Sequence, residues 1–214
     1  MKNQPPDCAC HCGERRDAAI PRRTAITASA LFLLSACTAH SPDASPDHVV
    51  IAPGLALIMP DPASLNRRIE AAQLVIARYR TQTIAFEARI SAAPDHFDLL
   101  CIDTLGREAM RIHWTQTGIV AEKAPWVPEN LHPENMLADI VLLYWPEPIV
   151  AQSLAASGGT ILAEPGLRSI RLLGKELIHA EFQPIGADPW NGKARYRNMP
   201  RDYALDIQSR LIRP

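Results

Sequence analysis

The sequence lacks the short motifs that mark common enzyme and metal sites. It contains no G-x-S-x-G nucleophile elbow, no G-x-x-x-x-G-K-[ST] phosphate loop and no H-E-x-x-H zinc motif. The histidines after residue 12 are far apart, and no pair has the spacing of metal ligands. We therefore expect no enzyme, no cofactor and no metal. The enzymatic alternative is an acyl- or glycosyl-transfer accessory that uses Asp139 or a histidine.

The chain also lacks an excess of charge of either sign. It has 22 Lys and Arg against 23 Asp and Glu, a formal net charge of −1, and no basic patch stands out. Proteins that bind nucleic acid carry clustered positive charge to neutralise phosphates. We therefore expect no nucleic-acid partner.

No apolar run is long enough to cross a membrane as a helix. The run at Ala25–Leu34 would rise about 15 Å as a helix, roughly half of the hydrocarbon core. Four arginines between residues 15 and 23 precede it, and Leu34–Cys37 follows it with the sequence "LSAC". A basic segment, an apolar segment and small residues are the order of an export signal.

The block "LSAC" resembles the lipobox of bacterial lipoproteins, in which the cysteine is acylated and the preceding peptide bond is cut. We expect residues 1–36 to be a lipoprotein signal peptide and Cys37 the lipidated residue. Residue 38 is Thr rather than the Asp that marks inner-membrane retention, so the resemblance implies the outer membrane, periplasmic face. The alternatives are an ordinary signal peptide with a chance cysteine or a misplaced start codon.

The remaining cysteines form no framework. The "CACHC" block at residues 8–12 lies before the expected cut, and no second cluster completes a tetrahedral metal site. Cys101 then has no partner for a disulfide, and we expect it to be a buried small hydrophobe.

Proline and serine punctuate the segment after Cys37. The stretches "SPDASP" and "PGLALIMPDP" predict a flexible tether over residues 37–64. Residues 65–214 are enough for one core but not for two. We expect a single domain there.

Period-two alternation of apolar and polar residues predicts strands on both sides of a helical middle. Gly106 and Gly174-Lys175 predict two tight hairpins. The segment 64–80 fits either a first helix or a first strand, and we favour a strand from about Glu70. The alternating stretches are 83–90, 110–114, 178–182 and 202–208.

The middle segment carries the helical pattern. Pro133 stands at a favoured first-turn position, and Met136, Ile140 and Leu143 form an apolar stripe. Pro146 and Pro148 are expected to end this helix, and 149–156 to form a second, short one. The order of strands, helices and strands predicts an α+β fold with one curved antiparallel sheet and helices across its apolar face.

Several motifs together resemble a known family. After the lipobox come "DTLGRE", the helix "MLADIVLLYWP", the hairpin "RSIRLLGKELIHAEF" and the end "WNGKARYRNMPRDYALDIQS". This arrangement resembles lipoproteins of unknown function from aryl polyene biosynthesis clusters. More distantly, it is similar to the outer-membrane lipoprotein receptor LolB of the LolA/LolB-like proteins. The resemblance covers about residue 70 to the C-terminus.

The resemblance implies a half-open β-barrel with helices as a lid over a cavity for acyl chains. It also implies that Leu105, in the turn before Gly106, engages the membrane or the cargo. The implied function is to bind an acyl-like or polyene lipid, or lipoprotein acyl chains, and to assist its placement in the outer membrane. The alternative is a structural or assembly partner of other envelope proteins, with a filled core.

Apolar and aromatic side chains near these motifs are the candidates for the cavity wall, since such residues supply most of the lining of ligand pockets. A filled core is the alternative for the tryptophans, and Trp190 is left open between the two. The candidates for the lining are Phe86, Ile112, Trp114, Met136, Ile140 and Trp145.

Overall fold

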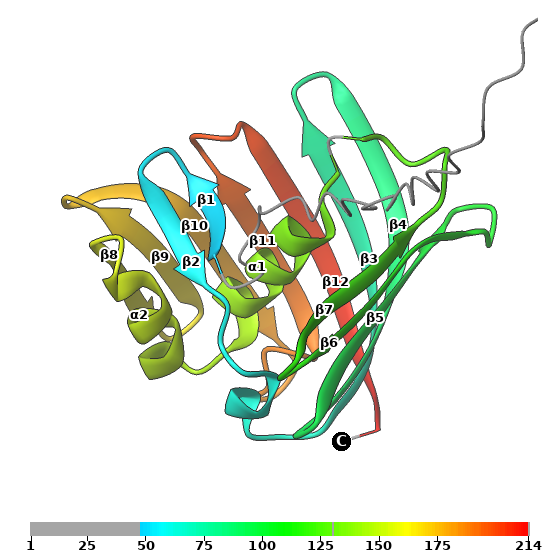
Figure 1. Ribbon diagram of the computed structural model, residues 1–214, viewed down its shortest axis with the longest axis horizontal. Coiled ribbons are helices and arrows are strands. Elements are labelled where there is room, and N and C mark those ends of the chain that lie inside the picture. The colour runs from blue at the N-terminus through cyan, green and yellow to red at the C-terminus, as the bar shows by residue number, and fades with distance from the viewer. Residues whose placement is uncertain (1–47, 130, 214) are drawn as a thin grey trace, which may run out of the picture. The chain divides into compact units, whose positions relative to one another are not determined.

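The computed structural model describes residues 48–129 and 131–213. The expected signal peptide and lipidated Cys37 lie outside the described residues. Most of the described chain is antiparallel strand, with two helices inserted between the seventh and eighth strands (Figure 1). The strands are β1 (His48–Ala52), β2 (Leu55–Ile58), β3 (Ile69–Tyr79), β4 (Gln82–Ala93), β5 (His96–Asp103), β6 (Glu108–Thr115), β7 (Gly118–Lys123), β8 (Gly159–Glu164), β9 (Leu167–Leu172), β10 (Lys175–Pro184), β11 (Gly192–Asn198) and β12 (Tyr203–Arg213); the helices are η1 (Pro62–Leu65), α1 (Pro133–Tyr144) and α2 (Glu147–Ala155).

Ten strands form one open sheet in the order β7-β6-β5-β4-β3-β12-β11-β10-β9-β8, and every neighbouring pair is antiparallel. The sheet curves, and α1 lies across its hollow side (Figure 1). The predicted α+β fold, a curved antiparallel sheet covered by helices, is therefore confirmed. The alternation that predicted the strands reflects burial of one face: in β6, Met110, Ile112 and Trp114 are buried.

The expected tether is wrong for residues 48–64. β1 and β2 pair as a hairpin, and Val49, Ile51, Leu55 and Leu57 are buried. This hairpin packs against α1 and α2 on the hollow side of the large sheet. Of the prolines that suggested a tether, Pro42 and Pro46 lie outside the described residues. The others, Pro53, Pro60 and Pro62, lie in the turn after β1 and around η1, where a fixed φ is compatible with the backbone.

Helix α1 begins and ends where its prolines predict. Pro133 is its first residue, and Trp145 is extended, at φ −70° and ψ 154°, immediately before Pro146. Pro148 does not end a helix, because it lies in the first turn of α2, where its missing N–H is not needed. The Arg168 guanidinium of β9 donates to the carbonyl oxygens of Leu142 and Trp145, at 3.1 and 2.7 Å. It thereby satisfies the free end of α1.

The core contains a close aromatic cluster beneath the end of α1. The rings of Phe97, Trp114 and Trp145 are 5.5–5.9 Å apart between centroids, in tilted and edge-on arrangements that favour aromatic pairs. Trp145 Nε1 donates to Ser64 Oγ of η1 at 2.9 Å. Cys101 is buried as predicted. Within the described part of the chain, no helix combines the length and apolarity needed to cross a membrane.

Candidate functional site

A cleft of about 480 Å³ opens between α1 and the hollow face of β3, β4 and β12. Much of its wall is apolar and only partly buried. Ile84 of β4 is 43% exposed, and Phe86, Met136 and Leu205 are half-buried. Apolar side chains on the inner face of a sheet are usually covered, so this cleft is the place where the fold leaves them accessible.

Three of the six residues predicted for the lining do lie on this wall: Phe86, Met136 and Ile140. The other three do not. Ile112, Trp114 and Trp145 are buried, at 3% exposure or less, in the filled core under the far end of α1. They belong to β6 and to the residue after α1, and the cleft ends before it reaches either.

Trp190 is also part of the filled core. Its ring stacks on Tyr144 with centroids 4.0 Å apart. Beside this stack, Gln73 Nε2 donates to Tyr144 Oη and to Ser209 Oγ, at 3.1 and 3.2 Å, and Ser209 donates to the Trp190 carbonyl oxygen at 2.6 Å. Gln73 and Tyr144 line the cleft. The cleft therefore ends at polar groups that are already hydrogen-bonded to one another.

The mouth of the cleft carries basic residues from two neighbouring turns. Tyr203 pairs with Tyr79 in the sheet, so the β3–β4 turn with Arg80 lies beside the β11–β12 turn with Arg201. Both arginines line the cleft. No local sequence signal marked them, since turns commonly carry charged residues and only the strand register brings these two together.

Asp139 of α1 is a buried carboxylate on the wall of the cleft. Its Oδ1 accepts from the hydroxyls of Tyr196 and Tyr203, each at 2.6 Å. Burial raises the pKa of Asp139 to about 6, although the two hydroxyls and the charge of Arg201 lower it. Asp139 lies neither on a solvated face nor in a helix cap, because Tyr196 of β11 and Tyr203 of β12 cover that side of α1.

Leu105 lies in the β5–β6 turn, well exposed at 77%. Asp103 holds this turn in one shape: its Oδ1 accepts from the backbone N–H of Leu105 and of Arg107, at 2.9 and 2.8 Å. Gly106 has φ +81°, a conformation that favours glycine. The Arg107 guanidinium lies 4.5 Å from the ring centroid of the half-exposed Trp126. The turn thus presents a leucine beside a cation and an indole.

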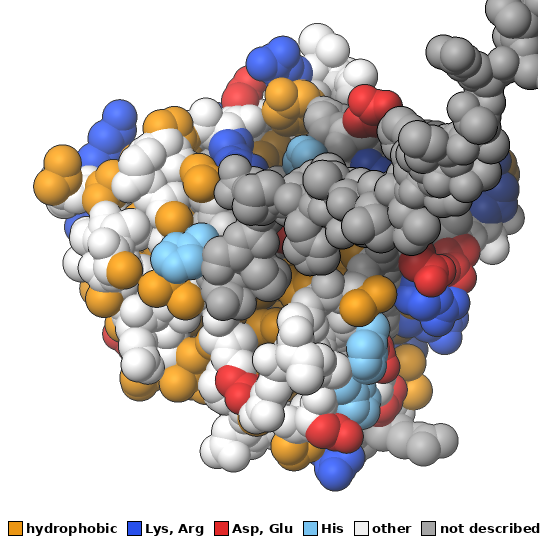
Figure 2. Space-filling model, viewed as in Figure 1, with side chains coloured by type: hydrophobic (Ala, Val, Ile, Leu, Met, Phe, Trp, Pro, Cys, Tyr) orange, Lys and Arg blue, Asp and Glu red, His pale blue; other side chains and the backbone are white. Residues whose placement is uncertain are grey.

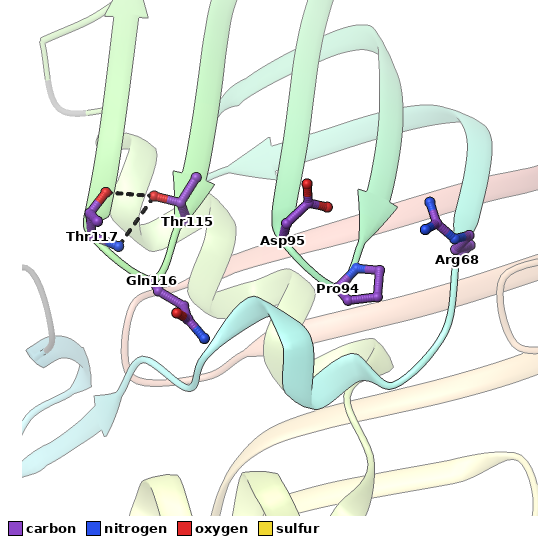
Figure 3. Close-up of a pocket in the computed structure, with 6 residues that line it drawn as sticks. All are labelled: Arg68, Pro94, Asp95, Thr115, Gln116 and Thr117. Atoms are coloured by element: carbon purple, nitrogen blue, oxygen red, sulfur yellow. Dashed lines mark hydrogen bonds between the residues drawn. The ribbon is translucent and has the colours of Figure 1, made fainter.

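A second depression, of about 500 Å³, lies among turns at the ends of β4 and β6. Figure 3 shows Pro94 and Asp95 in one turn, Thr115–Thr117 in the next, and Arg68 just before β3. Gln116 Nε2 donates to Asp61 Oδ2 at 2.6 Å. Five of its six lining residues are polar or charged, so it lacks the wall of large apolar side chains that lines the α1 cleft.

Charged and apolar side chains are interspersed over the face seen in Figure 2, without a patch of one sign. His113 Nδ1 is 2.5 Å from Asp98 Oδ1, and His179 Nδ1 is 2.8 Å from Glu176 Oε1. Both pairs are on the surface of the sheet. Over residues 48–129 and 131–213, no three His, Cys, Asp or Glu side chains gather as a metal site would require.

A family model described as "Protein of unknown function (DUF3261)" matches residues 70–210 of this chain. The chain belongs to this family. The matched part runs from β3 to β12 and includes the whole cleft wall formed by strands and by α1. A search of curated proteins finds no match.

Among solved structures, the chain is similar to a LolA superfamily protein from Nitrosomonas europaea. The sequence identity is 6%, the TM-score is 0.41, and the match covers 71% of this chain and 91% of the other. A likeness this distant does not identify a ligand, so the function of this DUF3261 member has to be inferred from its own residues.

Proposed function

We propose that this protein is a lipid-anchored envelope protein that binds the apolar chain of a lipid in the α1 cleft and assists its transfer to the outer membrane. The cargo is an acyl-like or polyene lipid, or the acyl chains of a lipoprotein. The protein acts in a pathway that makes an aryl polyene. The protein acts without catalysis. In support, the carboxylate of Asp139 is already occupied by two tyrosine hydroxyls.

The observation that carries the proposal is the accessible apolar wall of the cleft. Apolar surface removed from water contributes about 25 cal/mol per Å², and ligand pockets are mostly apolar concavities of about 300–1,000 Å³. The cleft, at about 480 Å³, is within that range. Its wall of Ile84, Phe86, Met136 and Leu205 offers contact to a chain and few hydrogen bonds.

Anchoring and delivery are assigned to two other positions. Acylation of Cys37 with two or more chains provides stable attachment to the bilayer. Leu105, held out by the Asp103 turn, contacts the membrane or the cargo. Serine in place of Cys37 is expected to abolish incorporation of labelled palmitate and to move the protein out of the outer-membrane fraction. Retained labelling would contradict the anchor.

The test of cargo binding compares two substitutions on opposite faces of β3. Ala77 lines the cleft, whereas Ala72 is on the other face of the same strand and is similarly half-buried. In Ala77→Trp the indole fills the cleft, whereas in Ala72→Trp it leaves the cleft open. The measurement is native mass spectrometry of the full chain with Cys37→Ser, made by cell-free synthesis without membranes and mixed with hexadecanoate.

We expect the protein without a β3 substitution and the Ala72→Trp variant to bind hexadecanoate. We expect the Ala77→Trp variant to lose about tenfold or more in affinity. Thermal unfolding of both variants checks that they are folded. A folded protein that binds no hydrophobic chain in any form would reject carriage. It would favour the alternative, a structural or assembly partner of other envelope proteins.

A further inference from the structure

We propose that the cargo of the cleft is a single-chain amphiphile with an anionic head group, with its chain inside the cleft and its head between Arg80 and Arg201. This inference rests on the proposed function and specifies its ligand. Three observations support it: the volume of the cleft, the arginines at its mouth, and the hydrogen bonds that already join the polar groups at its closed end.

The volume of the cleft admits a hydrocarbon chain. At about 480 Å³ it is within the size range of small-ligand pockets, roughly 300–1,000 Å³. The cleft lies between one helix and three strands, and we assign one chain to it; the stoichiometry measured below tests this assignment.

The charges at the mouth favour an anion. In the described part of the chain, neither Arg80 nor Arg201 has a carboxylate oxygen within 4.0 Å. Arg80 stacks on Tyr79, with its guanidinium carbon 5.1 Å from the ring centroid, and Arg201 donates to the Val50 carbonyl oxygen. By contrast, Arg78 of β3 is paired with Asp206 of β12. Guanidinium groups without an acidic partner bind carboxylate or phosphate in bidentate fashion.

The acidic residue on the cleft wall, Asp139, forms no ion pair within 4.0 Å with either cation in the described chain, although the charge of Arg201 lowers its pKa. Its Oδ1 already accepts from Tyr196 and Tyr203, and Tyr203 also reaches Oδ2 at 2.7 Å. With Arg80 and Arg201 counted against Asp139, the wall near the mouth has an excess of positive charge. A cleft with apolar walls concentrates such a field on the ligand.

The closed end sets the direction of the chain. Gln73 donates there to the hydroxyls of Tyr144 and Ser209. In the part of the protein that the structure describes, no buried side-chain nitrogen or oxygen is left without a partner. A head group at that end would have to displace these bonds, whereas at the mouth it meets Arg80 and Arg201, which form no ion pair with a carboxylate of the described residues. The hydrocarbon chain of the ligand therefore occupies the closed end of the cleft, and its head group stays at the mouth.

The experiment compares three probes with hydrocarbon chains of similar length: hexadecanoate, its methyl ester and hexadecyltrimethylammonium. The two ions are used below their micelle concentrations and the ester below its solubility limit. Dissociation constants come from displacement of a neutral fluorescent hydrophobe from the full chain with Cys37→Ser. The stoichiometry comes from native mass spectrometry. The variants are the double substitution Arg80→Gln with Arg201→Gln, and Arg210→Gln as a control on the opposite face of β12, where Arg210 is exposed.

The expected result is one hexadecanoate per chain, bound at least about tenfold more tightly than the methyl ester. The double variant is expected to lose that difference while its affinity for the ester stays within about twofold. The control keeps the difference. Equal affinity for the acid and the ester, tighter binding of the ammonium probe, or two ligands per chain would overturn the inference and leave the proposed function standing. Failure of all three probes to bind would reject both.

Discussion

The hydroxyl of Tyr203 lies 2.6 and 2.7 Å from the two carboxylate oxygens of Asp139, and it joins the start of β12 to the middle of α1. Tyr196 of β11 donates to the same carboxylate. Together with the Gln73–Tyr144 bond and the Arg168 contacts at the helix end, this ties α1 to the sheet beyond the cleft. The part of the helix before Asp139 is thus held over the apolar wall.

Removal of either tyrosine hydroxyl is expected to destabilise the protein. Hydrogen bonds to a charged group contribute about 1.5–3 kcal/mol each, so Tyr203→Phe and Tyr196→Phe are each expected to lower the free energy of unfolding by about that amount. Urea titration measures the change. Tyr79→Phe is the control, because no hydrogen bond of its hydroxyl is found in the described chain. Equal losses in Tyr79→Phe and Tyr203→Phe would contradict this role for Asp139.

Asp139 is expected to make the protein more stable as the pH falls from about 7 to 4. Burial raises its pKa to about 6 in the folded state, from an ordinary value of 3.8. Between these two values the folded state binds more protons than the unfolded state, so the free energy of unfolding decreases as the pH rises. The shift of about two units corresponds to about 3 kcal/mol.

The measurement is the difference in unfolding free energy between the wild type and Asp139→Asn from pH 4 to pH 8. The difference is needed because Glu176 acts in the opposite direction: its hydrogen bond from His179 lowers the pKa of Glu176, so acid removes that stabilisation. A difference that does not vary with pH would show that Asp139 keeps an ordinary pKa.

Leu173 is expected to strain the backbone of the β9–β10 turn. It has φ +51° and is 96% exposed, and Gly174 after it has φ +78°. Two consecutive positive φ angles favour Asn-Gly in a tight hairpin, and a left-handed conformation costs other residues about 1–2 kcal/mol.

Leu173→Asn is therefore expected to raise the free energy of unfolding by about 1 kcal/mol. Leu105→Asn is the matched control, since Leu105 is also an exposed turn leucine and its φ is not positive. Its change should stay within about 0.5 kcal/mol. Equal effects of the two substitutions in urea titration would refute the strain at Leu173.

The Cys101 thiol is expected to be unreactive in the folded protein. Burial raises its pKa to about 12, and the thiolate is the species that reacts with alkylating agents. Iodoacetamide at pH 8, followed by digestion and mass analysis of the Cys101 peptide, should show labelling only after denaturation. Rapid labelling of native protein would mean that β5 opens readily.

The sequence alone was enough to predict most elements of this fold. Alternation of buried and exposed residues, as in Met110, Ile112 and Trp114 of β6, is a property of single strands, so it can be read locally. The same holds for α1, whose ends are set by Pro133 and Pro146. Phe86, Met136 and Ile140, which were predicted for the lining from the family motifs, lie on these periodic stretches and on the cleft wall.

Only the tertiary structure decided which apolar side chains stay accessible. Phe86 and Trp114 both point to the hollow side of the sheet, but Trp114 packs on Trp145 while Phe86 lies on the cleft wall. The position of α1 makes this difference, and it depends on contacts such as Asp139 with Tyr203, 64 residues away in the chain. The β1–β2 hairpin was missed for the same reason. Its two strands have only five and four residues and are almost wholly apolar, so they show no alternation, and the prolines beside them suggested a tether. The helices that bury them are contacted only in the tertiary structure.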